Sequence, residues 1–201
     1  QKKKKIKKKY DIMYISSFRN PVKSYYDTHQ HYLTMNLSDA MSSYVLNILN
    51  NLQTEKKLKV CLALASNRKE KLKKISSFHE IDFIKRDLKN FIIEKKNSFD
   101  LASKSNLIVT THSTLGVELL ARGHKVLFIN PDYFFYNENI LKNFKNFFHV
   151  TSSNKKVISK SIIKLLKFSD KKWKNNFSKT LFKIPYDEKN KILKNLLIKL
   201  L

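Results

Sequence analysis

The chain has 201 residues, a formal net charge of +25 and a single cysteine. This length suffices for one domain with a hydrophobic core, and a lone cysteine excludes an internal disulfide. The sequence contains no CxxC or HExxH motif, so it does not indicate a structural zinc site. It also contains no run of about 18 apolar residues, so it does not predict a transmembrane helix.

Part of the positive charge lies in an N-terminal run, with seven lysines within Lys2–Lys9. We predict that residues 1–9 form a basic disordered tail and that residues 10–201 form the folded domain. No apolar segment follows the lysines, so they do not begin a secretory signal as the chain stands. Because the chain begins with Gln1 rather than methionine, we expect a fragment or a processed product.

A charge of this size suggests nucleic acid or an anionic membrane as a partner. The other lysines are spread along the chain without an RNA-binding or zinc-finger pattern, and the abundance of lysine, asparagine, isoleucine and phenylalanine fits an AT-rich coding bias. We therefore favour a cytoplasmic protein that contacts anionic lipid at the inner face of the membrane over one that binds nucleic acid. A non-catalytic basic module that binds nucleic acid or membrane is the alternative.

The first predicted strand is Tyr10–Ser16, and Ser17–Pro21 ends it. The carboxyl ends of parallel strands meet at one edge of a sheet, so Arg19 is a candidate phosphate ligand at that edge. An arginine in a solvent-facing loop is the alternative. We expect Lys23–Asn36, which lacks clear periodicity, to form a loop or the rim of a cleft.

A helix is predicted from a cap at Ser38-Asp39 to about Asn51, with an apolar stripe that packs on the core. Lys59–Ala65 is nearly all apolar, as in a central parallel strand, and holds Cys61 as a buried thiol. Arg68 follows this strand and is a second phosphate candidate. A basic helix and a short strand come next, at Lys69–Ile75 and Ile81–Ile84.

The segment Ser105–Pro131 holds both glycines and follows the pattern strand, polar turn, short helix, glycine, strand. A brief helix leads into it. The predicted elements are the helix Ser98–Lys104, the strand Asn106–Thr110, the turn Thr111–Thr114, the helix Val117–Arg122 ended by Gly123, and the strand Lys125–Ile129. Ser113 or Thr114 is a candidate N-cap. Such a unit belongs in a parallel sheet, where ligands bind beyond the carboxyl ends of the strands.

The polar turn has the chemistry of an anion site, because a helix start offers unpaired N–H groups and a partial positive charge. Ser113 and Thr114 add hydroxyl donors, and Gly116 would let a ligand approach the backbone. Glu118 is placed to accept hydrogen bonds from a ribose diol. The pattern predicts a nucleotide pocket. The alternative is an ordinary βα turn, with His112 a hydrogen-bonded turn residue and Glu118 solvated.

The C-terminal third begins with Asp132–Asn139, which is predicted as an irregular loop. There Tyr133 or Phe134 would either stack on a base or anchor the loop. The remaining predicted elements are the strand Phe147–Val150 and helices at Ser153–Lys167, from Ser169–Trp173 onward, and at Asp187–Leu201. Strands that alternate with helices predict an α/β fold, a Rossmann-like doubly wound and mostly parallel sheet.

The segment Ser105–Pro131 resembles the C-terminal, donor-binding domain of GT-B glycosyltransferases, especially those of bacterial capsule and surface-polysaccharide synthesis. In that group a strand ends in an ST-x-G-x-E turn, followed by an alanine-rich helix, a glycine, a basic residue and a V-L-F strand. The matching residues are Ser113, Thr114, Gly116, Glu118, Ala121, Gly123, Lys125 and Val126-Leu127-Phe128. Many retaining members carry another glutamate eight positions before the one that matches Glu118, and this chain has Thr110 at that position. The stereochemistry of transfer is therefore not indicated.

The resemblance covers about a seventh of the chain. It implies the donor-binding half of a glycosyltransferase, whose acceptor domain would lie upstream. The enzyme would transfer a sugar from a nucleotide-sugar donor to a glycan or lipid-linked acceptor without a cofactor or an obligatory metal. The predicted donor-binding residues are His112, Ser113, Thr114, Leu115, Gly116, Glu118, Arg19 and Arg68. UDP-sugar 2-epimerases and glycerol-phosphate polymer transferases use the same half-fold and are alternatives.

Overall fold

One six-stranded sheet organises the chain, in the order β3-β2-β1-β4-β5-β6. The computed structural model describes residues 8–18, 29–64, 80–94, 97–131 and 147–179, without the side chains of 29–38. The strands are β1 (Tyr10–Ile15), β2 (Val60–Ala63), β3 (Ile92–Ile93), β4 (Ser105–Thr110), β5 (Val126–Ile129) and β6 (His149–Val150). All the pairings are parallel. The predicted Rossmann-like α/β fold is confirmed.

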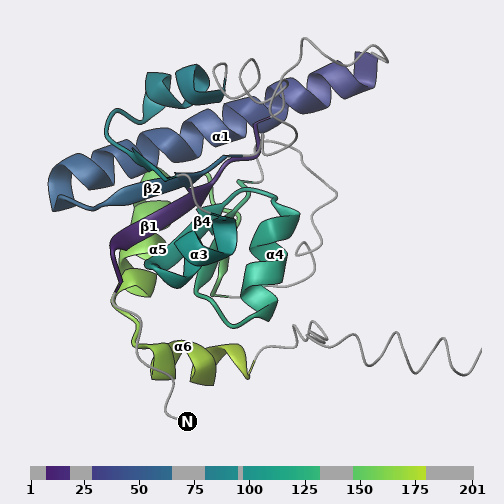
Figure 1. The fold of residues 1–201 in the computed structure, drawn as a ribbon. Helices are drawn as coiled ribbons and strands as arrows, with labels where there is room; N and C mark the ends of the chain where they lie inside the picture. Colours follow the sequence, from purple (N-terminus) through teal and green to yellow (C-terminus); the bar gives the residue numbers. More distant parts are fainter. Residues whose placement is uncertain (1–7, 19–28, 65–79, 95–96, 132–146, 180–201) are drawn as a thin grey trace, which may run out of the picture.

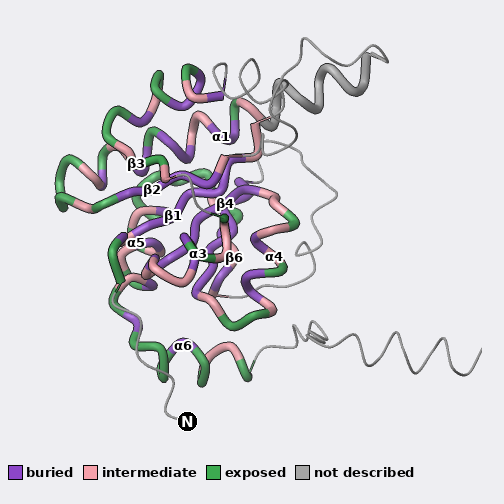
Figure 2. Tube along the Cα trace, viewed as in Figure 1, coloured by how far each residue is buried: buried purple, intermediate pink, exposed green. Residues whose placement is uncertain are grey.

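The centre of the sheet is its most deeply buried part. β1 and β4 pair along their length, and β2 and β5 flank them with four buried residues each. Strands covered on both faces lose the alternation of apolar and polar residues, which explains the continuous apolar runs in this sequence. Figure 2 shows the central strands buried, whereas Ile92 and Ile93 of the edge strand β3 are exposed.

Helices cover both faces of the sheet (Figure 1). α3 and α4 lie on one face, while α1 and α5 lie on the other and contact each other. The helices are α1 (His29–Lys56), an unlabelled helix at 80–87, α3 (Ser98–Ser103), α4 (Thr114–Ala121), α5 (Lys155–Leu166) and α6 (Asp170–Phe177). This arrangement follows from right-handed crossovers that leave the central strands in opposite directions.

The predicted helices at 98–104, at 153–167 and from Ser169 onward are confirmed. Each begins at a residue whose side chain accepts a hydrogen bond from a backbone N–H group of the first turn, as preferred N-cap residues do. The capping residues are Asn97, Asn154 and Ser169. The predicted elements at Lys69–Ile75, Asp132–Asn139 and Asp187–Leu201 lie outside the described residues.

Two predictions in the first half of the chain are wrong. α1 begins at His29, so the proposed cap at Ser38-Asp39 lies within a helix and His29–Asn36 is not a loop. No glycine or proline interrupts this stretch, so nothing ends the helix once the core-facing turns after Asp39 form. The predicted strand Ile81–Ile84 is part of the helix at 80–87. Its buried residues Phe83 and Ile84, together with Leu88 directly after its end, follow helical spacing.

Gly123 ends α4, as the sequence predicts. Its φ of +85° lies in the left-handed region, and its N–H and that of His124 bond to the carbonyls of Leu120 and Leu119. These two hydrogen bonds form a Schellman motif, in which the residue with positive φ is usually glycine. The turn sends the chain directly into β5.

Candidate functional site

The strand order places a topological switch point between β1 and β4. The connection after β1 leads to α1 on one face, and the connection after β4 leads to α4 on the other. Where successive connections part in this way, a crevice opens beyond the carboxyl ends of the strands, and doubly wound proteins bind ligands there. The polar turn predicted as an anion site lies at this position, because Thr111 and His112 directly follow β4.

A chain of hydrogen bonds joins the two strand ends. The hydroxyl oxygens of Ser17, after β1, and Thr111, after β4, are 2.9 Å apart. The same Thr111 oxygen lies 3.0 Å from Nδ1 of His112. Thr111 is fully buried, so its single hydroxyl serves both neighbours. This arrangement orients the imidazole of His112 at the mouth of the switch point.

The start of α4 faces the same region. Ser113 occupies the N-cap position with extended backbone angles, and its side chain makes no capping hydrogen bond. The first N–H groups of a helix have no partner within the helix, so a side chain that leaves them uncapped suits an anion. α4 begins at Thr114, three residues before the predicted Val117. Leu115 packs partly against the core.

Gly116 faces the sheet. A β-carbon at this position would lie 2.8 Å from Cγ2 of Thr110 and 3.2 Å from the ring of Phe128. The glycine lets α4 pack closely on β4 and β5, and its role toward a ligand stays a prediction. This packing still serves the site, because it holds the helix start beside the end of β4.

Glu118 lies on the outer surface of α4 and pairs with Arg122 one turn later, at 2.9 Å. The guanidinium of Arg122 also lies over the ring of Phe99, 4.3 Å from its centroid. An exposed pair four residues apart adds only about 0.3–0.5 kcal/mol, so the carboxylate is available to a stronger partner. Its role toward a ribose stays a prediction.

Arg19, Arg68, Tyr133 and Phe134 all lie outside the described residues. Neither Ser17 nor Thr111 was predicted as a site residue. The available signal was their position directly after two apolar strands, but their contact depends on β1 and β4 being neighbours.

A cluster of three acidic residues, Asp39, Glu80 and Asp87, lies near Tyr14 in the carboxyl half of β1. Burial, together with the charges of Glu80, Asp39 and Asp87, raises the pKa of the enclosed Tyr14 hydroxyl. Asp39, on α1, is itself partly buried, and this burial raises its pKa to about 6, although Arg86 acts in the opposite direction. The ionised carboxylate of Asp39 is therefore less favourable in the folded protein than in the unfolded chain.

We expect Asp39→Asn to stabilise the protein at pH 7. An aspartate titrates near 3.9 in an unfolded chain, so the folded protein loses stability as the pH rises from about 4 to about 6. Solvent screening of this half-exposed group limits the gain to about 1 kcal/mol. Urea unfolding at pH 4 and pH 7 measures it, with Asp82→Asn on the exposed side of helix 80–87 as the control. An equal effect at both pH values would contradict the assignment.

Within the described residues, no group of three or more histidine, cysteine, aspartate or glutamate side chains is arranged to hold a metal ion. The same part of the chain contains no helix that combines the length and the apolar character needed to cross a bilayer. Cys61 is buried, as predicted, and burial raises its pKa to about 11.

Comparison with known proteins gives one family. A family model described as "putative O-antigen biosynthesis protein" matches residues 1–201. No curated protein matches the chain.

Proposed function

The chain belongs to the O-antigen biosynthesis family whose model spans residues 1–201, and on this premise we propose that it is the donor-binding half of a glycosyltransferase. The donor would be a nucleotide-sugar, and the acceptor a growing surface glycan or its lipid-linked precursor. Family membership supports a role in polysaccharide biosynthesis. The geometry at the switch point supports the nucleotide.

The observation that carries the proposal is the linkage of Ser17, Thr111 and His112 beside the uncapped start of α4. A diphosphate needs several donors that converge from rigid elements. The first-turn N–H groups of α4 supply some of them, and His112 supplies another from an orientation set by Thr111. Such preorganised donors stabilise charge as it develops on the leaving nucleotide.

Glu118, Arg19 and Arg68 complete the proposed donor site. The Glu118 carboxylate would release Arg122 and accept hydrogen bonds from the ribose hydroxyls. The arginines follow β1 and β2, so they would approach the phosphates from the other half of the crevice. Transfer of a labelled sugar separates this function from the two related ones. A 2-epimerase changes the sugar of the donor itself, and a polymer transferase uses an activated glycerol phosphate.

Nucleotide binding is expected to raise the melting temperature of the protein. A nucleoside diphosphate at about 100 times its Kd stabilises by about 2.7 kcal/mol, or roughly 5–10 °C for a domain of this size. We expect Thr111→Val, which keeps the shape of the buried side chain but removes its hydroxyl, to weaken binding about tenfold. A thermal-shift titration with UDP, GDP and CMP measures both effects.

Thr54→Val is the matched control, because Thr54 lies near the carboxyl end of α1, where its hydroxyl donates to the Asn50 carbonyl. Its nucleotide affinity should equal that of the unmodified protein. The proposal fails if no nucleotide raises the melting temperature, or if Thr111→Val and Thr54→Val bind equally well. Binding of polyanions that depends only on salt would favour a basic binding module.

A further inference from the structure

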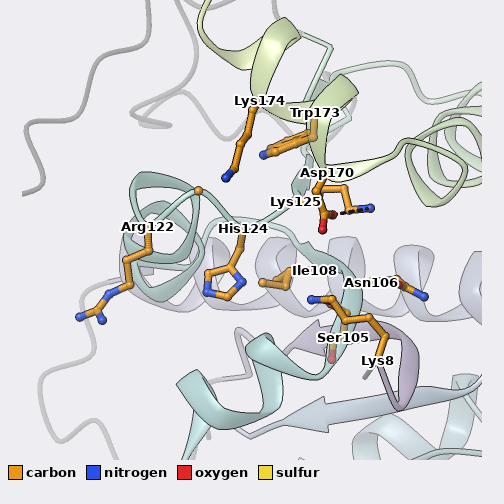
Figure 3. Close-up of a pocket in the computed structure, with 11 residues that line it drawn as sticks. Lys8, Ser105, Asn106, Ile108, Arg122, His124, Lys125, Asp170, Trp173 and Lys174 are labelled. Atoms are coloured by element: carbon orange, nitrogen blue, oxygen red, sulfur yellow. Dashed lines mark hydrogen bonds and ion pairs between the residues drawn. The ribbon is translucent and has the colours of Figure 1, made fainter. Parts of the chain in front are cut away.

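A hollow lies near the amino end of β4, at the end of the parallel strands opposite the switch point. Its volume is about 230 Å³, and it is walled by the start of β4, the turn from α4 to β5, α6, and Lys8 (Figure 3). The switch point lies beyond the carboxyl end of β4, so the two places are separated by the length of the strand. The hollow is therefore a separate place from the proposed donor site.

Positive side chains dominate its wall. Four cationic side chains and a single carboxylate line the hollow, and one of the four, Arg122, is paired with Glu118. The other three cations leave two positive charges in excess over the carboxylate. The charged lining residues are Lys8, Arg122, Lys125, Lys174 and Asp170, and His124 lies among them. Clustered like charges repel one another, and this repulsion is strongest where water is partly excluded.

Two of these ammonium groups donate their shortest hydrogen bonds to backbone carbonyls. Nζ of Lys8 donates to the carbonyls of Ser103 and Ser105, at 3.0 and 2.8 Å. Nζ of the buried Lys125 donates to the carbonyl of Phe168 at 2.8 Å and lies 3.6 Å from a carboxylate oxygen of Asp170. Carbonyls fix the position of an ammonium without cancelling its charge. The hollow thus presents oriented, incompletely neutralised cations.

The pKa shifts of Lys8 and His124 are consistent with an excess of positive charge in the hollow. Burial lowers the pKa of Lys8, and the charge of Lys125 lowers it further against the opposing effect of Asp170. Burial also lowers the pKa of His124, and the charges of Lys8 and Arg122 act in the same direction. Each group is in an environment that disfavours additional positive charge, and a bound anion would relieve this.

The indole of Trp173 points to the same kind of ligand. Its side chain is 1% exposed and its Nε1–H has no hydrogen-bond partner among the described residues. Figure 3 shows the nitrogen end of the ring turned to the same side as the ammonium of Lys174. A buried donor without an acceptor destabilises the folded protein. An acceptor between these two groups would satisfy both.

We propose that this hollow binds a phosphoryl group through Lys8, His124, Lys125, Lys174 and the indole N–H of Trp173. A phosphate dianion matches the excess charge and offers acceptor oxygens in several directions, whereas a carboxylate carries one charge in a single plane. The phosphoryl group comes either from a soluble phosphate or from the headgroup of an anionic lipid, and the experiment separates these sources.

Trp173 is the only tryptophan in the chain, so its fluorescence reports directly on the hollow. We expect inorganic phosphate, titrated at constant ionic strength, to change this fluorescence in a saturable way and to raise the melting temperature. Lys174→Gln should weaken binding about five- to tenfold. Lys171→Gln, an equal change of charge at another exposed position of α6, should leave the affinity unchanged.

Vesicles test the lipid source. Phosphatidylcholine vesicles that contain phosphatidic acid are compared with phosphatidylcholine alone, again with both lysine variants. A response to inorganic phosphate identifies a soluble ligand, and a response only to phosphatidic acid identifies a headgroup, provided that Lys174→Gln reduces it. The proposal is overturned if neither probe acts, if acetate binds as tightly as phosphate, or if Lys171→Gln and Lys174→Gln lower the affinity equally.

Discussion

Replacement of Trp173 by alanine is expected to reduce the free energy of unfolding by about 3–5 kcal/mol, the usual range for truncating a buried large aromatic side chain. The ring of Trp173 stacks on Phe177, with centroids 6.0 Å apart, and meets Phe147 edge-on at 5.1 Å. Phe147 also contacts Phe148 and Phe168. Trp173 therefore links α6 to the segment that enters β6 and, through Phe147, to Phe168 beyond the end of α5. Alanine would leave a cavity among these rings.

Thermal unfolding followed by circular dichroism measures this loss, since the variant no longer contains tryptophan. A decrease in melting temperature on the order of 10 °C is expected for a chain of this length. Trp173→Phe keeps an aromatic ring and should recover more than half of the loss, while Lys171→Gln should stay within about 0.5 kcal/mol of the original protein. An unchanged midpoint in Trp173→Ala would show that α6 unfolds separately from the sheet.

A side chain at Gly116 is expected to destabilise the protein by about 1–3 kcal/mol as alanine, and by more as valine. The added β-carbon would meet Thr110 at 2.8 Å and the ring of Phe128 at 3.2 Å, closer than carbon atoms normally approach. Helix propensity alone predicts the opposite, a gain of up to about 1 kcal/mol for Gly116→Ala. The sign of the measured change thus decides which effect wins, and we expect the packing to prevail.

Thr110→Ser is the matched partner for this test. It removes the Cγ2 methyl group but keeps the hydroxyl, which donates to the carbonyl of Ile15 at 3.3 Å. Urea unfolding of the two single variants and the double variant should show that Gly116→Ala costs less when residue 110 is serine, by about 0.5–1 kcal/mol. Strict additivity, or a stabilising Gly116→Ala, would mean that α4 shifts to accommodate the new carbon.

This packing role changes how the motif around Gly116 is used in an experiment. Loss of nucleotide binding in Gly116→Val would report displacement of α4 as readily as a lost ligand contact. Variants of Thr111 and His112 test nucleotide binding more directly than Gly116→Val does. Thr111→Val, for example, preserves the volume of the buried side chain. The glycine acts on the proposed site through the position of the helix start.

The predicted elements were correct where a local signal was strong. The strands near 10–15, 60–63, 105–110 and 126–129 are short apolar runs bounded by polar residues, and all four are confirmed. Ser169 and Gly123 mark a helix start and a helix end by their own chemistry. At Ile81–Ile84 two isoleucines suggested a strand, but burial of Phe83, Ile84 and Leu88 on one side of a helix prevailed. Short apolar runs are compatible with either state.

The amino-acid sequence by itself determined the α/β class, the central strands and the polar character of the turn after β4. These depend on backbone preference and hydrophobic pattern within a few residues, which act before distant segments meet. Only the tertiary structure decided that β1 and β4 are neighbours, that Ser17 reaches Thr111, and that Gly116 faces Phe128. It also gathered Lys8, Lys125 and Lys174 around Trp173. Such contacts join residues far apart in the chain, and they follow from the order in which the strands pair.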